Sequence, residues 1–217
     1  MILDNLSKFI AARVREHPQI AEWLGDWSPE FETQVNINTD GLEPAHFDLK
    51  SKPTKWLTPE GSLIGHIRIP HNAYTDRPTF GDRRAHGNEH KYWQYIGTTG
   101  WNWRRCRSHW VGFDFDSIAN HKGGLTAEQL EEILNRARAL PYVVARTSKS
   151  TKGIHLIVRL DPQPATKTHT EHSALARYVL NRMSDECNFP FHSGIDCCGS
   201  VLWHWAKGLT SDGLKRI

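Results

Sequence analysis

The stretch Trp110-Val111-Gly112-Phe113-Asp114-Phe115-Asp116 decides the interpretation of the fold, because it places two aspartates inside an otherwise apolar run. Side chains of a β-strand point alternately to the two faces of a sheet. Asp114 and Asp116 would therefore share one face, and Phe113 and Phe115 would enter the core on the other. Two neighbouring carboxylates repel each other unless a cation lies between them, and their oxygens suit Mg²⁺ or Mn²⁺. The stretch predicts a metal-binding strand and favours phosphate chemistry.

The sequence after this strand alternates between helical and extended patterns. It predicts a helix over 126–140, strands over 142–147 and 154–160, a helix over 168–183 and a strand around Ile195. Thr126 and Gln129 have the spacing of a capping box at the start of the first helix, and Thr168 and Glu171 have it at the start of the second. Pro141 ends the first helix, because proline cannot continue one.

This order of elements, β-α-β-β-α-β, predicts an α+β fold with a ferredoxin-like or RRM-like unit. Both helices would cover one face of the sheet and leave the other face open. The first strand would be central with the last strand beside it, so that Asp196 would join Asp114 and Asp116 on the open face. In an ideal form of this topology the third strand would run parallel to the first. His155, at the start of the third strand, would then lie toward the end of the sheet far from the aspartates.

The N-terminal part of the chain has a different pattern. Apolar residues at helical spacing predict a helix over 2–16, which Pro18 closes. Short alternating pieces over 33–69 indicate strands and long loops, and the polar segment 70–91 reads as an exposed loop. We therefore divide the chain into an N-terminal α/β extension, residues 1–91, and a second subregion, residues 92–217.

Composition excludes some classes of protein. Of the 217 residues 38% are hydrophobic and 24% are charged, and no apolar run is long enough to span a bilayer. The N-terminus lacks the basic-then-apolar layout of a signal peptide, so we expect a cytoplasmic protein that does not bind a membrane. Four cysteines, of which Cys197 and Cys198 are adjacent, make a poor disulfide framework and favour reduced thiols.

Positive charge and tryptophan gather before the aspartates. The net charge is only +3, but the run Trp103-Arg104-Arg105-Cys106-Arg107 is strongly basic, and Trp93, Trp101 and Trp110 surround it. Tryptophan and arginine together can stack on unpaired bases of a nucleic acid. The same tryptophans can equally fill a hydrophobic core. Both interpretations stay open at this stage.

A second polar constellation is the loop Ser148-Lys149-Ser150-Thr151-Lys152-Gly153-Ile154-His155. Successive backbone N–H groups in a tight, glycine-containing turn form a site for anions, and Lys152 adds a positive charge for phosphate oxygens. A solvated hairpin would have the same composition. Together with the aspartates on the preceding strand, the loop favours a triphosphate site.

Three motifs in this order resemble those of the archaeo-eukaryotic primase superfamily, the primase-polymerases of plasmids, phages and archaea. They are Val111–Asp116, then Ser150-Thr-Lys152-Gly153-Ile-His155, then Gly194-Ile195-Asp196. The middle motif also resembles that of the polymerase domains attached to bacterial end-joining ligases. The resemblance covers about residues 92 to 208.

This resemblance implies a DNA primase or DNA polymerase, that is, template-directed nucleotidyl transfer. By analogy, Asp114, Asp116 and Asp196 hold two Mg²⁺ or Mn²⁺ ions. Ser150, Lys152 and His155 bind the triphosphate of the incoming NTP or dNTP. The partners would be a DNA template and primer, with residues 1–91 contacting the template, and a fused or associated helicase. We therefore expect a catalytic unit that belongs to a longer protein.

The chain departs from the family pattern after the third motif. A basic residue commonly follows the third aspartate there, whereas Cys197, Cys198 and Gly199 follow it here, and the nearest cations are His204 and Lys207. Lys207 is the candidate for a further phosphate contact.

A structural zinc site is a second possible metal centre. His86 and His90 are spaced like ligands, and so are Cys106 and His109. Thirteen histidines make such spacings common by chance. A second group is Cys187, His192, Cys197 and Cys198, but its adjacent cysteines favour buried thiols over a tetrahedral site.

Three other functions compete with the polymerase interpretation. Phe113-Asp114-Phe115-Asp116 resembles the nucleophile motif of haloacid dehalogenase phosphatases. Those phosphatases carry the motif near their N-terminus and need a later motif of paired acids, and this sequence meets neither condition. RNase H-like nucleases also carry carboxylates on strands, but they do not use a triphosphate loop. A non-catalytic RRM-like module that binds single-stranded nucleic acid would need exposed aromatic rings on its sheet.

Overall fold

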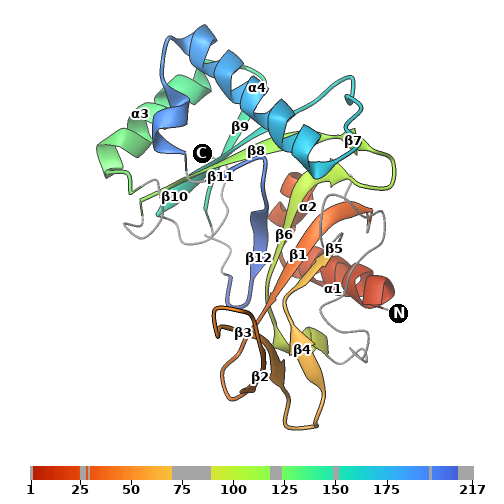
Figure 1. Ribbon diagram of the computed structural model, residues 1–217. Helices are drawn as coiled ribbons and strands as arrows, with labels where there is room; N and C mark the ends of the chain where they lie inside the picture. Colours follow the sequence, from red (N-terminus) through yellow and green to blue (C-terminus); the bar gives the residue numbers. More distant parts are fainter. Residues whose placement is uncertain are drawn as a thin grey trace.

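The structure, a computed structural model, describes residues 2–24, 28, 30–69, 89–117, 124–148, 152–195 and 197–209. It is a mixed α+β architecture in which helices pack on antiparallel sheets (Figure 1). One sheet carries the Asp114–Asp116 strand, a second contains strands from the start, middle and end of the chain, and a third is smaller and peripheral. This confirms the α+β fold class.

The sheet that carries the aspartates has four strands in the order β11-β8-β10-β9. These strands are β8 (Trp110–Asp116), β9 (Val143–Thr147), β10 (Gly153–Arg159) and β11 (Cys197–Cys198). Every neighbouring pair is antiparallel. The expectation that the third strand runs parallel to the first is therefore wrong. Its antiparallel direction pairs His155 directly with Asp114 instead of placing it at the far end of the sheet.

Two helices, α3 (Ala127–Arg138) and α4 (His169–Cys187), cover one face of this sheet (Figure 1). The core between them contains Phe113 and Phe115, both fully buried, together with Leu156, Leu180 and Met183. The aromatic side chains of β8 thus enter the core as the alternation predicts.

The predicted helix starts are confirmed. Thr126 and Gln129 form a reciprocal capping box, and the Thr168 side chain accepts a hydrogen bond from the Glu171 backbone N–H. The second helix continues to Cys187, beyond its predicted end, and stops where Asn188 takes a left-handed backbone conformation with φ of 45°. The strand predicted around Ile195 is wrong in position, because a short 3-10 helix, η2 (Phe191–Gly194), precedes β11.

The larger sheet has the order β12-β6-β1-β5, with β7 paired to β6. Its strands are β1 (Phe31–Ile37), β5 (Ile67–Ile69), β6 (Trp93–Asn102), β7 (Arg107–Ser108) and β12 (Leu202–Ala206). The helices α1 (Ile2–Glu16) and α2 (Gln19–Leu24) and the 3-10 helix η1 (Glu89–Tyr92) lie beside it. Strands from both sides of residue 91 share this sheet, and the division of the chain at that residue stays a prediction.

The two larger sheets pack directly on each other. Trp110, Ile157 and Leu202 form a buried apolar cluster between them. Gly112 permits this approach, because a Cβ at that position would lie 2.4 Å from a Leu202 methyl carbon. The face opposite α3 and α4, which we expected to be open, is therefore partly covered by β12.

A third sheet with the order β2-β3-β4 lies at one end of the molecule (Figure 1). Its strands are β2 (Glu43–Phe47), β3 (Pro53–Leu57) and β4 (Leu63–Gly65), and β2 is exposed along its whole length. In the parts of the chain that the structure describes, no helix is long and apolar enough to cross a membrane.

Candidate functional site

A row of polar side chains crosses the four-stranded sheet. The strand registers pair Cys197 of β11 with Asp114 of β8, Asp114 with His155 of β10, and His155 with Arg146 of β9. Directly paired residues of neighbouring strands project from the same face of a sheet. One strand position thus brings together four residues that are far apart in the sequence, on the face opposite the helices.

His155 lies between a carboxylate and a guanidinium group. Its Nε2 atom is 3.3 Å from Oδ1 of Asp114, and its Nδ1 atom accepts a hydrogen bond of 3.1 Å from Nε of Arg146. Because an arginine can only donate, Nδ1 carries no proton, and the neutral ring holds its proton on Nε2, facing Asp114. Burial, and then the charge of Arg146, lower the pKa of His155, which keeps the ring neutral.

Arg146 is a fully buried cation at the junction of the two larger sheets. It donates from Nη1 to His204 Nδ1 at 3.0 Å and from Nη2 to the Trp203 carbonyl at 3.1 Å, both on β12. His204 is buried too, and its Nε2 is 2.8 Å from the Thr98 hydroxyl on β6. Burial lowers the pKa of Arg146 to about 9, and the negative charge of Asp114 acts against that change. The group therefore remains charged at neutral pH.

These contacts join into a chain of polar groups, Asp114–His155–Arg146–His204–Thr98. The chain runs from the candidate site in one sheet to the middle of the other. Since Arg146 also donates to His204 Nδ1, that ring likewise carries its proton on Nε2. The orientation of His155 thus depends on β12 and β6 as well as on its own strand.

Asp116 ends β8 opposite the point where the predicted anion loop leads into β10. It pairs in register with Gly153, and its side chain is mostly buried. The Ser148 N–H donates to the Gly153 carbonyl at 2.8 Å, and the Ser117 N–H donates to the Lys152 carbonyl at 3.3 Å. These bonds hold Lys152, whose side chain is exposed, beside the end of the aspartate strand.

Gly153 allows the loop to come this close. A Cβ at this position would lie 2.5 Å from the Phe115 carbonyl oxygen and 3.2 Å from the Asp116 Cα. We expect Gly153→Ala to displace the loop from β8 and destabilise the fold by about 1 to 3 kcal/mol, measured by urea unfolding. Gly41→Ala is the matched control, because Gly41 has open space around its Cβ position, and any cost there comes only from its positive φ. Equal stability of Gly153→Ala and the wild type would contradict this prediction.

Asp114 fits a role as a cation ligand. Its Oδ1 atom is buried and accepts no hydrogen bond from any described residue; the neutral His155 ring lies 3.3 Å away, and the charge of Arg146 balances part of the negative charge. Asp116 follows two positions later on the same face of β8. Carboxylate oxygens are the ligand type that Mg²⁺ and Mn²⁺ prefer.

The remaining predicted site residues cannot be placed. Asp196 and Ser150 lie outside the described residues. Cys197 and not Asp196 is the residue paired with Asp114, and β11 begins only at Cys197. Within the described residues, no group of three or more potential ligands is positioned to hold a metal ion. The three-aspartate set therefore stays a prediction.

The tryptophans before the aspartates belong to the core. Trp93, Trp101, Trp103 and Trp110 have between 2% and 7% of their surface exposed. They cannot offer free faces to unpaired bases, so this use of them, which the sequence left open, is wrong.

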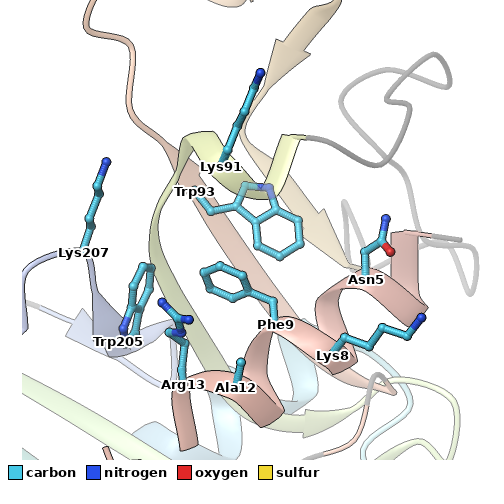
Figure 2. A pocket seen from close by; sticks show the side chains of 9 residues that line it. All are labelled: Asn5, Lys8, Phe9, Ala12, Arg13, Lys91, Trp93, Trp205 and Lys207. Atoms are coloured by element: carbon cyan, nitrogen blue, oxygen red, sulfur yellow. The ribbon is translucent and has the colours of Figure 1, made fainter. Parts of the chain in front are cut away.

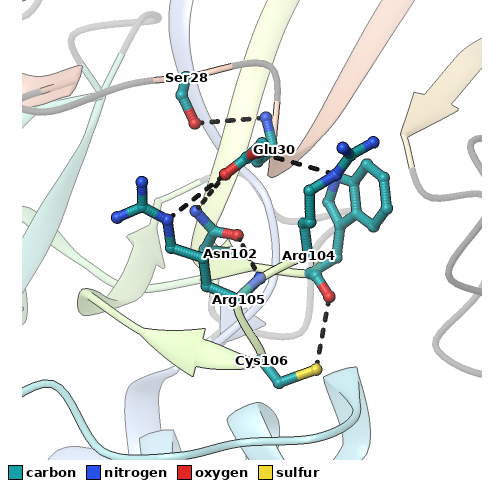
Figure 3. Close-up of polar contacts among 7 residues, drawn as sticks. Ser28, Glu30, Asn102, Arg104, Arg105 and Cys106 are labelled. Carbon is teal, nitrogen blue, oxygen red and sulfur yellow. Dashed lines mark hydrogen bonds and ion pairs between the residues drawn. The ribbon is translucent and has the colours of Figure 1, made fainter.

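The basic run beside Trp103 is partly neutralised (Figure 3). Glu30 lies 3.7 Å from Nε of Arg104 and 3.6 Å from Nε of Arg105, and it also accepts a hydrogen bond from Asn102. The Arg104 guanidinium lies over the Trp103 ring, 5.2 Å from the ring centroid. The run thus forms a turn that Glu30, the residue before β1, holds against the larger sheet.

Within the described residues, neither predicted group of zinc ligands forms a metal site. His86 and the side chain of His90 lie outside the described residues. Cys106 donates to the Trp103 carbonyl, and the His109 ring packs edge-on against Phe31. All four cysteines are free thiols.

No family model matches the chain, and no curated protein is similar to it. Among solved structures, the polymerase domain of ligase D from Mycobacterium tuberculosis, in complex with DNA, is similar with 16% identity and a TM-score of 0.39, over 91% of this chain and 72% of that one.

Proposed function

We propose that the chain is a template-directed nucleotidyltransferase, a DNA primase or polymerase. The observation that carries this proposal is the pairing of Asp116 with Gly153, which sets two carboxylates of one strand beside the loop that ends in Lys152 and Gly153. Carboxylates for metal ions next to a cationic, glycine-containing loop are the two parts that phosphoryl transfer from a triphosphate needs.

The proposed metal ligands are Asp114, Asp116 and Asp196. Asp196 is included by analogy with the third motif, and its chain neighbour Cys197 is the residue that pairs with Asp114. When bound, two Mg²⁺ or Mn²⁺ ions would supply activation of the primer 3′-hydroxyl and neutralisation of the leaving pyrophosphate. No side chain of the protein then has to act as a nucleophile.

The proposed triphosphate contacts are Lys152 and Ser150. For His155 we revise the role that the resemblance implies, because both of its ring nitrogens face protein groups, Asp114 and Arg146. We propose that His155 holds the Asp114 carboxylate in place, with its Nε2–H directed at Oδ1. His155 is then a positioning residue and not a direct ligand of the triphosphate.

We also infer that the four-stranded sheet with α3 and α4 is a ferredoxin-like unit. Its strand order, β11-β8-β10-β9, and its chain order support this inference. A purely nucleic-acid-binding RRM-like module is less well supported, because the face opposite the helices presents Asp114, His155 and Arg146 where such a module needs exposed rings.

The test is a primer-extension assay beside a primer-synthesis assay, each with rNTP or dNTP pools and with Mg²⁺ or Mn²⁺. We expect incorporation that follows the template sequence, that stops in EDTA and that returns when the metal is restored. Phosphate release from a phosphomonoester through a trapped phospho-aspartate, or strand cleavage without nucleotides, would instead support the phosphatase or the nuclease.

A further inference from the structure

A pocket of about 500 Å³ lies between α1, η1 and the strands β6 and β12, apart from the aspartates (Figure 2). Its floor is aromatic. The Phe9 ring contacts Trp93 and Trp205 edge-on, with centroids 4.9 and 5.2 Å apart. Trp93 and Trp205 are almost fully buried, whereas Phe9 is half-buried. Phe9 is therefore the most exposed of the three rings, and the Arg13 guanidinium lies over it, 5.0 Å from the ring centroid.

The rim of the pocket is basic. It carries Lys8 and Arg13 from α1, Lys91 from η1 and Lys207 after β12. None of the described residues that line the pocket is acidic. Figure 2 shows Lys8 and Lys207 on opposite sides of the ring cluster. An extended polyanion that crosses the pocket would meet a cation on each side of the aromatic floor.

Two of these cations have carboxylate partners outside the pocket. Arg13 lies 2.7 Å from Glu16, and Lys91 lies 2.6 Å from Glu60. All four of these side chains are at least about a quarter exposed. Exposed ion pairs contribute little free energy, so exchanging the carboxylate for a phosphate costs little. Glu16 and Glu60 thus reduce the positive charge of the rim, but they leave Arg13 and Lys91 able to contact a phosphate.

The pocket and the candidate active site face opposite sides of β12. His204 points to Arg146, and the next residue, Trp205, contributes to the pocket floor. β12 has a register shift between Trp203 and Trp205, so contacts and not simple alternation fix the two directions: Trp205 packs against Phe9 of α1, whereas His204 bonds Arg146. A ligand in this pocket is thus separated from Asp114 by the larger sheet and would not occupy the triphosphate site.

We propose that this pocket binds a segment of single-stranded nucleic acid, with a base against Phe9 and flanking phosphates on Lys8 and Lys207. A nucleotide unit combines a flat ring with an anion, as the pocket combines an aromatic floor with a basic rim. Its volume lies within the usual range of ligand pockets. An acidic peptide would match the charge but leave the aromatic floor without a planar partner. The proposal deepens the proposed function, and it rests on that function for the choice of a nucleic acid.

The test measures binding of a dye-labelled oligo-dT strand by fluorescence anisotropy in EDTA, where the aspartates hold no metal and no nucleotide is present. We expect Lys8→Ala/Lys207→Ala to weaken binding about tenfold or more and to reduce the salt dependence of the affinity. Phe9→Leu, which keeps an apolar side chain in the helix, should weaken binding about tenfold because it removes the ring.

Lys50→Ala/Lys52→Ala is the matched control, since it removes two exposed lysines from the turn between β2 and β3, and it should bind like the wild type. Wild-type affinity of both the Lys8/Lys207 and the Phe9 variants, with normal thermal unfolding, would overturn the proposal. So would competition by polyglutamate that equals competition by unlabelled oligo-dT. Asp116→Asn should bind normally, so failure of the enzymatic proposal and failure of this one are distinguishable.

Discussion

Asp114→Asn and Asp116→Asn are each expected to reduce nucleotide incorporation by about 1,000-fold, because losing one carboxylate removes several kcal/mol of metal-dependent stabilisation of the transition state. The substitution keeps the shape of the side chain and removes only its charge. The measurement is the initial rate of single-nucleotide primer extension in saturating Mg²⁺ or Mn²⁺.

A second readout separates loss of metal from loss of fold. Mn²⁺ that binds the folded protein raises its unfolding temperature by mass action. We expect this rise in the wild type and in Asp40→Asn, which changes an exposed carboxylate between β1 and β2, but not in Asp114→Asn or Asp116→Asn. Without metal, Asp116→Asn should be at least as stable as the wild type, because one of two neighbouring negative charges is gone, whereas Asp114→Asn should be less stable, because it also removes the charge that favours the buried Arg146 cation. Full incorporation activity in either variant would refute the proposed site.

Arg146→Met is expected to have the largest effect on stability, lowering the free energy of unfolding by about 3 to 5 kcal/mol. The reason is that three acceptors lose their donor together, the buried rings of His155 and His204 and the part-buried carbonyl of Trp203. Methionine fills much of the space, so the loss reports mainly the missing hydrogen bonds. Urea unfolding followed by tryptophan fluorescence measures it, with Arg138→Met on the exposed face of α3 as the control.

Arg146→Lys tests whether this residue also orients the site. Lysine keeps the charge but cannot serve three acceptors in the fixed planar geometry of a guanidinium group. We expect it to recover part of the stability while His155 loses its fixed tautomer. ¹⁵N NMR of the histidine rings reports which nitrogen carries the proton. An unchanged His155 tautomer in Arg146→Lys, with reduced incorporation, would show that Arg146 does not act through His155.

Local signals in the sequence were sufficient for much of the aspartate-bearing half. The alternation of Trp110–Asp116 predicted a strand with its phenylalanines in the core, and the threonine caps marked where both helices begin. These features depend on residues within a few positions of each other. The larger sheet was not predicted, because β6 and β12 are recognised as partners only through pairing across about a hundred residues.

The candidate site was predictable only in part for the same reason. The sequence motifs identified the aspartate strand and the loop before His155, but they did not predict the register in which β8 pairs with β10. Arg146 looked like an ordinary strand residue, since its acceptors lie 9 and 58 positions away. The tryptophans were ambiguous because composition alone does not distinguish a buried ring from an exposed one. Asp196 and Ser150 remain predictions.

The interleaving of the two larger sheets limits how the chain can be shortened for laboratory expression. A fragment that starts at residue 92 would keep every motif residue but lose β1, the strand that pairs with β6 along almost its whole length. The uncovered edge of β6 would then be open to pairing with other molecules. Recombinant fragments should therefore retain β1, even though none of its residues belongs to the three motifs.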